Sequence, residues 1–150
     1  MGLFSFLFKK DEGVGGKTKS SGVKLNKFGE ETTGDNSDCH GNTRIIRERI
    51  EKVLSQKYPG YYVKDGYSLA EYGVFPKNNN VKKNVDLILT NPAGKEIAII
   101  IFLRSEMFRA PWCKELYKSV SLKGMESIHF FIHLPNRICY IEKRLAEFLG

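Results

Sequence analysis

The sequence has few cysteines: Cys39, Cys113 and Cys139 are the only three among 150 residues. An odd number of widely spaced cysteines does not build the disulfide framework on which small secreted domains depend. His40 follows Cys39, but no second pair of ligands stands at the spacing that a zinc finger uses. We therefore expect free thiols in a reducing cytoplasm and no metal site at this position.

Residues 1–10 lack the length and the charge order of a membrane-spanning or secretory segment. A transmembrane helix needs about 20 apolar residues, and a secretory signal places its positive charge before the apolar run. Phe6 stands where the myristoylation pattern has Ser or Thr. We interpret the segment as an apolar tip that contacts an anionic membrane surface; the alternative is a short tail that packs on its own domain or on nothing. The residues expected to contact membrane are Leu3, Phe4, Phe6, Leu7, Phe8, Lys9 and Lys10.

Residues 11–41 contain few large apolar side chains and consist mostly of Gly, Ser, Thr, Asn, Asp and Lys. Such a segment cannot bury enough surface to offset the entropy lost on ordering, so we expect a flexible linker. Gly13 to Thr18 ends like a phosphate-binding loop, but the first glycine of that pattern and a preceding hydrophobic strand are missing. The sequence therefore predicts an apolar N-terminal tip (1–10), a linker (11–41) and a folded domain (42–150).

Acidic residues are too few to balance the charge of the expected domain. The formal net charge is +7, and six lysines balance six acidic residues within residues 1–40, so the whole excess falls on residues 41–150. A basic domain of this size can contact nucleic acid or an anionic membrane, or can simply carry solvated lysines.

The most apolar part of the chain, residues 84–105, is expected to form the centre of the fold. It contains two β-branched and aliphatic stretches, 85–89 and 97–103, separated by Asn91-Pro92-Ala93-Gly94. Proline and glycine suit the second and fourth positions of a turn. The pattern predicts an antiparallel hairpin that is buried on both faces, and Asp86 is the one acidic residue in its first strand.

The rest of the domain shows alternating helical and strand patterns. A helix capped by Asn42 or Thr43 is expected to end before Tyr58, and strand material at 61–63 and 67–72 surrounds an Asp65-Gly66 turn. A second helix runs from Pro111 to Gly124 with Cys113 in its core face, and a strand covers 128–134. Asn136 is expected to cap a last helix, and the second helix to cross over so that the strand at 128 runs parallel to a neighbour.

This order of elements, together with VDLILTNPAGKEIAIIIFL, resembles the restriction-endonuclease-like, or PD-(D/E)XK, nuclease superfamily. The resemblance covers residues 43–149 and implies an α/β fold: helix, three-stranded antiparallel meander, helix, strand, helix, here with a flexible N-terminal arm. It also implies Mg²⁺ chemistry, in which carboxylates hold the metal and a lysine acts on water. Asp86 matches the first acidic position of the family, and it would be the catalytic ligand if the domain were active.

The second acidic position of the family is not matched. A tight turn at Pro92-Ala93 would place Asp86 opposite Ile99, and the acid-x-lysine motif would then fall on apolar residues at 101–103. Glu96, the only acid of the second strand, would lie about 10 Å along the strand from Asp86, too far to share one Mg²⁺. We therefore expect Asp86 to pair with Lys82, Lys83 or Arg104, and expect neither a metal nor another cofactor.

The sequence favours a degenerate nuclease-like domain that acts in binding, with nucleic acid as the expected partner. Two alternatives stay open: a membrane-tethered module that binds a protein partner, and an Mg²⁺-dependent nuclease whose acids have moved to positions such as Glu48, Glu51 or Glu71. Aromatic residues interleaved with basic ones, as in single-strand binders, are not evident along the chain. The residues expected to contact nucleic acid are Lys82, Lys83, Arg104, Arg109 and Lys114.

Overall fold

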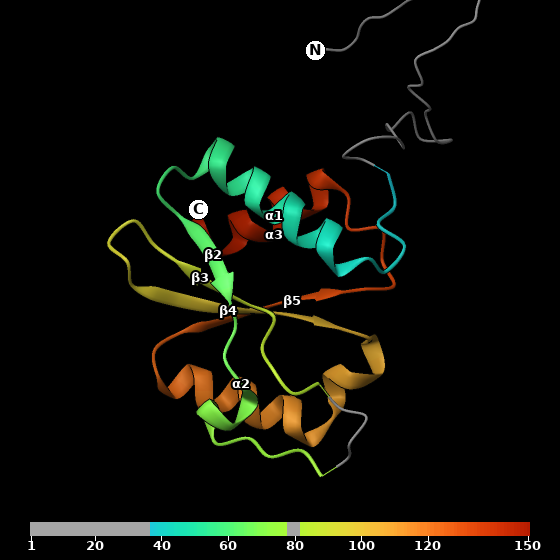
Figure 1. Ribbon diagram of the computed structural model, residues 1–150, viewed down its shortest axis with the longest axis vertical. Helices are drawn as coiled ribbons and strands as arrows, with labels where there is room; N and C mark the ends of the chain where they lie inside the picture. Colours follow the sequence, from blue (N-terminus) through green and yellow to red (C-terminus); the bar gives the residue numbers. More distant parts are fainter. Residues whose placement is uncertain (1–36, 78–81) are drawn as a thin grey trace, which may run out of the picture. The chain divides into compact units, whose positions relative to one another are not determined.

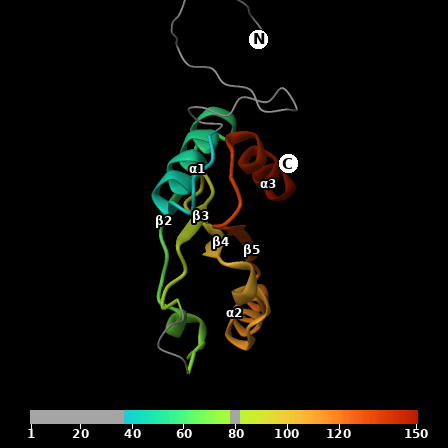
Figure 2. The same cartoon turned by 90° about the vertical axis from the view of Figure 1, so that its right-hand side faces the viewer.

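The computed structural model describes residues 37–77 and 82–150. The expected membrane-contact residues of the tip, and most of the expected linker, lie outside these residues. The chain divides into two units, Met1–Ser37 and Asp38–Gly150, and the second is described here by itself. In this unit a β-sheet lies between two layers of helices (Figure 1). The view from the side separates α1 and α3 on one face of the sheet from α2 on the other (Figure 2).

The sheet has four strands in the order β2-β3-β4-β5. β2 pairs with β3, and β3 with β4, in antiparallel orientation, whereas β5 pairs with β4 in parallel orientation. The predicted α/β class, the antiparallel meander and the parallel crossover strand are therefore confirmed. The elements are α1 (Thr43–Lys57), β2 (Tyr62–Asp65), η3 (Leu69–Tyr72), β3 (Leu87–Thr90), β4 (Glu96–Leu103), η4 (Ser105–Arg109), α2 (Pro111–Leu122), β5 (Glu126–Phe131) and α3 (Ile138–Leu149).

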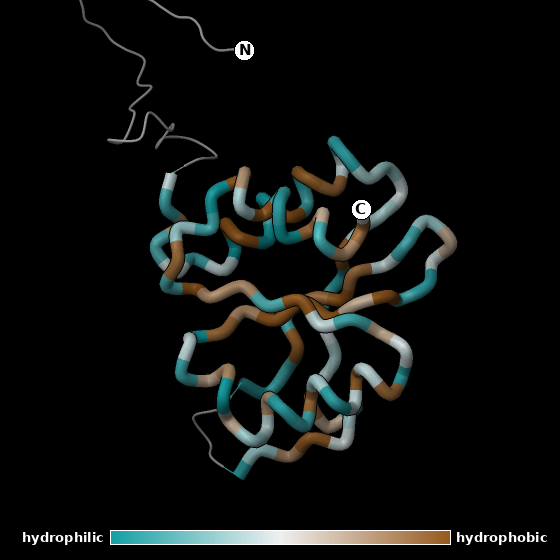
Figure 3. The backbone as a smooth tube through the Cα atoms, turned by 180° about the vertical axis from the view of Figure 1, so that it is seen from behind, coloured by the Kyte–Doolittle hydropathy of each residue, from teal (hydrophilic) through white to brown (hydrophobic). Residues whose placement is uncertain are grey.

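Both faces of the central hairpin are buried, as its apolar composition predicts. All four residues of β3 and the last six of β4 are buried, and the most hydrophobic stretches of the chain follow these strands (Figure 3). Because side chains alternate along a strand, Leu87 and Ile100 belong to the core under α1 and α3, whereas Ile88 and Ile99 belong to the core under α2. The sheet thus separates two hydrophobic cores.

The hairpin register differs by two residues from the expected one. Leu87 pairs with Ile100, and continuing this register places Asp86 opposite Ile101 instead of Ile99. The cause is a longer loop: the backbone N–H of Asn91 donates to the carbonyl of Lys95, and a bulge lies between Leu89 and Thr90. The five-residue loop shifts β4 relative to β3.

No hairpin forms around Asp65-Gly66, and residues 67–72 are not a strand. After β2 the chain runs beside residues 83–85, with the Val85 N–H donating to the Tyr67 carbonyl. Ser68 then caps a short 3₁₀ helix, Leu69–Tyr72, through its hydroxyl. The partner of β2 is β3, not the segment that follows the turn.

Asn136 does not cap α3, and the last strand is shorter than the alternating pattern predicts. β5 ends at Phe131, because the side-chain amide of Asn136 donates to the carbonyls of Phe131 and Leu134 and folds residues 131–136 into a tight loop. Asn136 adopts φ +49° in this loop and is buried. Arg137 stands at the N-cap position of α3 and makes no side-chain capping bond.

The folded unit begins before the expected end of the linker at residue 41. Cys39 is buried against the core under α1 and α3, and its backbone N–H donates to the carbonyl of Pro135 at 3.0 Å. Asp38 accepts a charged hydrogen bond from Arg137 at 3.0 Å. Asn42 then caps α1 as expected, accepting from the N–H groups that follow it.

Candidate functional site

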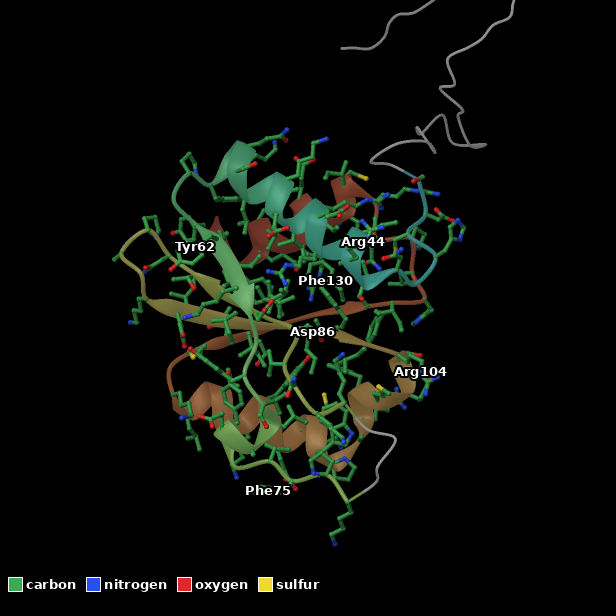
Figure 4. The ribbon with its side chains drawn as sticks, viewed as in Figure 1. Arg44, Tyr62, Phe75, Asp86, Arg104 and Phe130 are labelled. Carbon is green, nitrogen blue, oxygen red and sulfur yellow. The ribbon has the colours of Figure 1, made fainter. Side chains whose placement is uncertain are left out.

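One end of the sheet collects the start of β3 and the ends of β4 and β5. β3 runs antiparallel to β4, and β5 runs parallel to it, so these three points must lie together. Asp86 immediately precedes β3, and Arg104 immediately follows β4. Arg104 lies at the outer margin of the molecule, with Asp86 farther in (Figure 4). We call this region, where the carboxyl ends of β4 and β5 lie beside the start of β3, the carboxyl edge of the sheet. The name refers to these strand ends and not to the outermost strand.

Both oxygens of the Asp86 carboxylate are engaged within the protein. Oδ1 lies 3.0 Å from the ammonium group of Lys82, and Oδ2 accepts a hydrogen bond from the backbone N–H of Phe102 at 2.7 Å. The expected pairing with Lys82 is therefore confirmed. Burial raises the pKa of Asp86, although Lys82 and the Phe102 N–H act in the opposite direction.

The residues around Asp86 do not fit a divalent cation. Mg²⁺ requires several oxygen ligands at about 2 Å, but the corrected register places Ile101 opposite Asp86. Among residues 37–77 and 82–150, no three His, Cys, Asp or Glu side chains are grouped so that they could hold a metal ion. The carboxylate is positioned by an ammonium and an amide, which are donors and compete with a metal for its lone pairs.

Two of the acids that the nuclease alternative would relocate are paired on α1. Glu48 binds Arg44 at 2.7 Å, and Glu51 lies 3.6 Å from Arg47. Glu71 is exposed in the first turn of η3. In the described part of the chain, none of the three joins Asp86 in a metal-binding group.

The expected nucleic-acid contacts lie on segments that meet at the carboxyl edge. Lys83 is exposed just before β3, and Arg104 is exposed just after β4 with Glu106 at 3.3 Å. Arg109 ends η4, and Lys114 lies in the first turn of α2; both are exposed. Two of the five charges are thus paired with a carboxylate, Lys82 with Asp86 and Arg104 with Glu106, and the Lys82 pair is the more buried of the two.

The same edge carries an aromatic cluster that the sequence analysis did not identify. Phe108 of η4 lies 4.6 Å from His129, 5.8 Å from Phe131 and 5.8 Å from Tyr117 of α2, measured between ring centroids. His133 follows at 5.7 Å from Phe131. We call these five residues the ring cluster. Burial is the main cause that lowers the pKa of His129, with Arg144 adding to it, so this imidazole favours its neutral form.

Part of the signal for the ring cluster was present in the alternation along β5. His129 and Phe131 are two residues apart and so share one face of the strand. The contributions of Phe108 and Tyr117 depend on the short helix η4 and on the crossover of α2, which bring rings from distant parts of the chain to that face. No local spacing marks such a group.

Cys113 is not suited to act as a nucleophile of this site. Cys113 is buried in the core under α2, and burial raises the pKa of its thiol to about 11. At neutral pH the reactive thiolate is therefore scarce.

No family model, curated protein or solved structure matches this chain. Within residues 37–77 and 82–150, none of the helices is both long and apolar enough to pass through a bilayer.

Proposed function

We propose that the domain has a restriction-endonuclease-like architecture and binds nucleic acid without cutting it. The architecture is supported by the element order α1-β2-β3-β4-α2-β5-α3 and by a mixed sheet whose last strand is parallel to its neighbour. Asp86 stands at the start of β3, where the resemblance places a metal ligand.

The observation that carries the proposal is the environment of Asp86. Its charge is compensated by Lys82 at 3.0 Å, and its second oxygen accepts from Phe102 N–H at 2.7 Å. Hydrolysis by this class of nuclease requires metal ions, held by several carboxylates, to offset the negative charge of the scissile phosphate. Among residues 37–77 and 82–150, no group of His, Cys, Asp or Glu side chains completes such a centre with Asp86, which supports binding without metal-dependent hydrolysis.

The basic groups of the edge supply contacts to phosphate without chemistry. Arg109 and Lys114 flank the junction between η4 and α2, and Lys83 is exposed on the neighbouring segment. Phosphate contacts made by such side chains release counterions, and they account for most non-specific affinity for nucleic acid. Binding should therefore weaken steeply as salt increases.

The test is retention of fluorescent oligonucleotides by the full chain, measured at increasing salt. The charge reversals Arg109→Glu and Lys114→Glu, combined in one variant, should weaken binding at least tenfold at low salt. They should also reduce the slope of log K against log salt, by about 0.7 per lost contact for a single strand and about 0.9 for a duplex.

Lys95→Glu is the control for each of the single reversals Arg109→Glu and Lys114→Glu, because Lys95 is exposed in the β3–β4 loop at the opposite end of these strands. It changes the net charge in the same direction and should weaken binding much less. Equal losses in the control and in the single edge variants, or no binding by the wild type at low salt, would overturn the proposal. Mg²⁺- or Mn²⁺-dependent cleavage that disappears in Asp86→Ala would overturn it as well.

A further inference from the structure

We propose that the ring cluster is a stacking platform for unpaired bases, so that the ligand of this domain is single-stranded nucleic acid. The inference rests on the proposed function and names its substrate class. It assigns to Phe108, His129 and Phe131 a role that the basic residues alone cannot provide, because phosphate contacts do not distinguish a single strand from a duplex.

Two rings of the cluster, Phe108 and His133, are exposed to solvent. Phe108 is 36% exposed, and it is supported by His129 at 4.6 Å and by edge-on contacts with Tyr117 and Phe131. His133 is exposed at the end of the series. An exposed ring held from behind by other rings is already oriented, so a base that stacks on it loses little additional entropy.

Arginines flank Phe108 along the chain, and one of them, Arg104, lies 3.3 Å from Glu106. Phe108 is preceded by Arg104 across η4 and is followed at once by Arg109, and both arginines are exposed. Binding sites for single strands combine a basic surface that follows the backbone with aromatic side chains that stack on the bases. The arrangement is thus complementary to an anionic chain that carries flat, apolar groups.

The unpaired side of β5 is partly obstructed, so a single-stranded nucleic acid on the rings is favoured over a peptide strand added to the sheet. β5 is the last strand of the sheet, and such edges can accept an extended peptide through their free backbone groups. Here the Arg144 side chain donates a hydrogen bond of 2.9 Å to the backbone carbonyl of His129. A peptide strand that paired with β5 would need this carbonyl as an acceptor. The ring faces are free of this obstruction, because they project from the sheet toward η4 and α2.

A duplex is not complementary to the same surface. Its bases are stacked on one another, so their faces are covered, whereas unpaired bases can be splayed out onto aromatic side chains. We therefore expect a preference for single strands that comes from the rings, on top of the affinity that comes from the charges.

The experiment compares the binding of single-stranded DNA, single-stranded RNA and duplex DNA of one sequence by the full chain, using fluorescence anisotropy. Phe108→Ala should weaken binding to single strands about tenfold, since stacking on one base contributes that order of affinity, and should leave duplex binding nearly unchanged. Phe108→Leu retains apolar bulk without a ring and should show a similar loss, whereas Phe108→Trp should restore binding.

Phe75→Ala is the matched control. Phe75 is 73% exposed but lies away from Arg104 (Figure 4), so its removal should not change binding. Circular dichroism verifies that each variant is folded. A preference for either DNA or RNA single strands supports the inference.

The inference and the proposed function fail in different ways. Salt-dependent binding in which duplex and single strand are equal and Phe108→Ala has no effect would overturn the stacking platform and leave the proposed function intact. Absence of binding to all three oligonucleotides would overturn both.

Discussion

The carboxylate of Asp86 accepts a hydrogen bond from the backbone N–H of Phe102, at 2.7 Å, and so joins the start of β3 to the end of β4. The last backbone pair of these strands is Leu87 with Ile100, so the strand ladder does not reach Phe102 from the β3 side. Phe102 is buried, and a buried N–H without an acceptor is costly. The Asp86 carboxylate provides this acceptor, because the backbone of β3 does not extend far enough to pair with Phe102.

The first prediction concerns the pH dependence of stability in Asp86→Asn. Because burial raises the pKa of Asp86, the folded state holds the proton more tightly than the unfolded state. The contribution of this carboxyl to the free energy of unfolding is therefore largest below its unfolded pKa of about 3.9 and decreases as the pH rises through the folded value. We expect the wild type to lose stability relative to Asp86→Asn as the pH rises from about 4 toward neutrality.

Urea unfolding at several pH values measures this difference directly. Asparagine keeps an oxygen that can accept from Phe102 N–H, so the comparison isolates the charge. A difference between the two proteins that stays constant, or that changes in favour of the wild type with rising pH, would contradict the direction assigned to the pKa.

The second prediction concerns Lys82→Met, which removes the cation from the pair. The two side chains are only 23% and 21% exposed, so loss of the ammonium leaves a mostly buried carboxylate without its counter-charge. We expect the free energy of unfolding at pH 7 to fall by about 1–2 kcal/mol, between the values typical of surface and buried pairs. Adding Asp86→Asn to this variant should restore much of the loss, and a double-mutant cycle without coupling would contradict the pairing.

The sequence was sufficient to predict an α/β domain with a mixed sheet, because the patterns that specify this coarse fold are local. The apolar runs at 85–89 and 97–103 predicted the buried strands β3 and β4, and Asn42 predicted the start of α1. Pro111 at the first position of α2 likewise marked the crossover that places β5 parallel to β4. These signals are periodicity and capping, which neighbouring residues determine.

The register of the β3–β4 hairpin and the ring cluster were harder to predict, because they depend on contacts between residues that are distant in the sequence. The loop from Asn91 to Lys95 could not be distinguished from a shorter turn by composition, and this shifted the expected partner of Asp86 by two residues. Asn136 has the residue type of a helix cap but binds the carbonyl of Phe131 instead. The position of Phe108 follows from η4, which has no periodic signature.

The third prediction tests the close approach of the chain at Gly66. A Cβ atom at this position would lie 2.0 Å from the carbonyl oxygen of Val85, a backbone atom that cannot rotate away. Gly66→Ala should therefore separate the extension of β2 from residues 83–85 and lower the thermal midpoint by many degrees or prevent folding. The reason is steric, since the backbone of Gly66 is not left-handed.

Gly94→Ala is the matched control for this substitution. Gly94 adopts φ +83° in the β3–β4 loop, and a Cβ there meets nothing within 4 Å, so only the cost of a left-handed alanine applies, about 1–2 kcal/mol. Thermal unfolding of both variants should rank Gly66→Ala as much more destabilising. Equal effects would show that the two segments are not in contact in solution.

The fourth prediction concerns the hydroxyl of Tyr117, which supports the ring cluster from α2. Its oxygen is buried and has no hydrogen-bond partner among the described residues, and burial raises the pKa of the phenol. An unpaired buried hydroxyl costs about 1–3 kcal/mol, so Tyr117→Phe should increase the free energy of unfolding by about 1 kcal/mol. Tyr117→Leu removes the ring together with the hydroxyl and should be destabilising, because it leaves Phe108 without one of its supports. Urea unfolding of the three proteins gives the order, and a loss of stability in Tyr117→Phe would show that the hydroxyl has a partner.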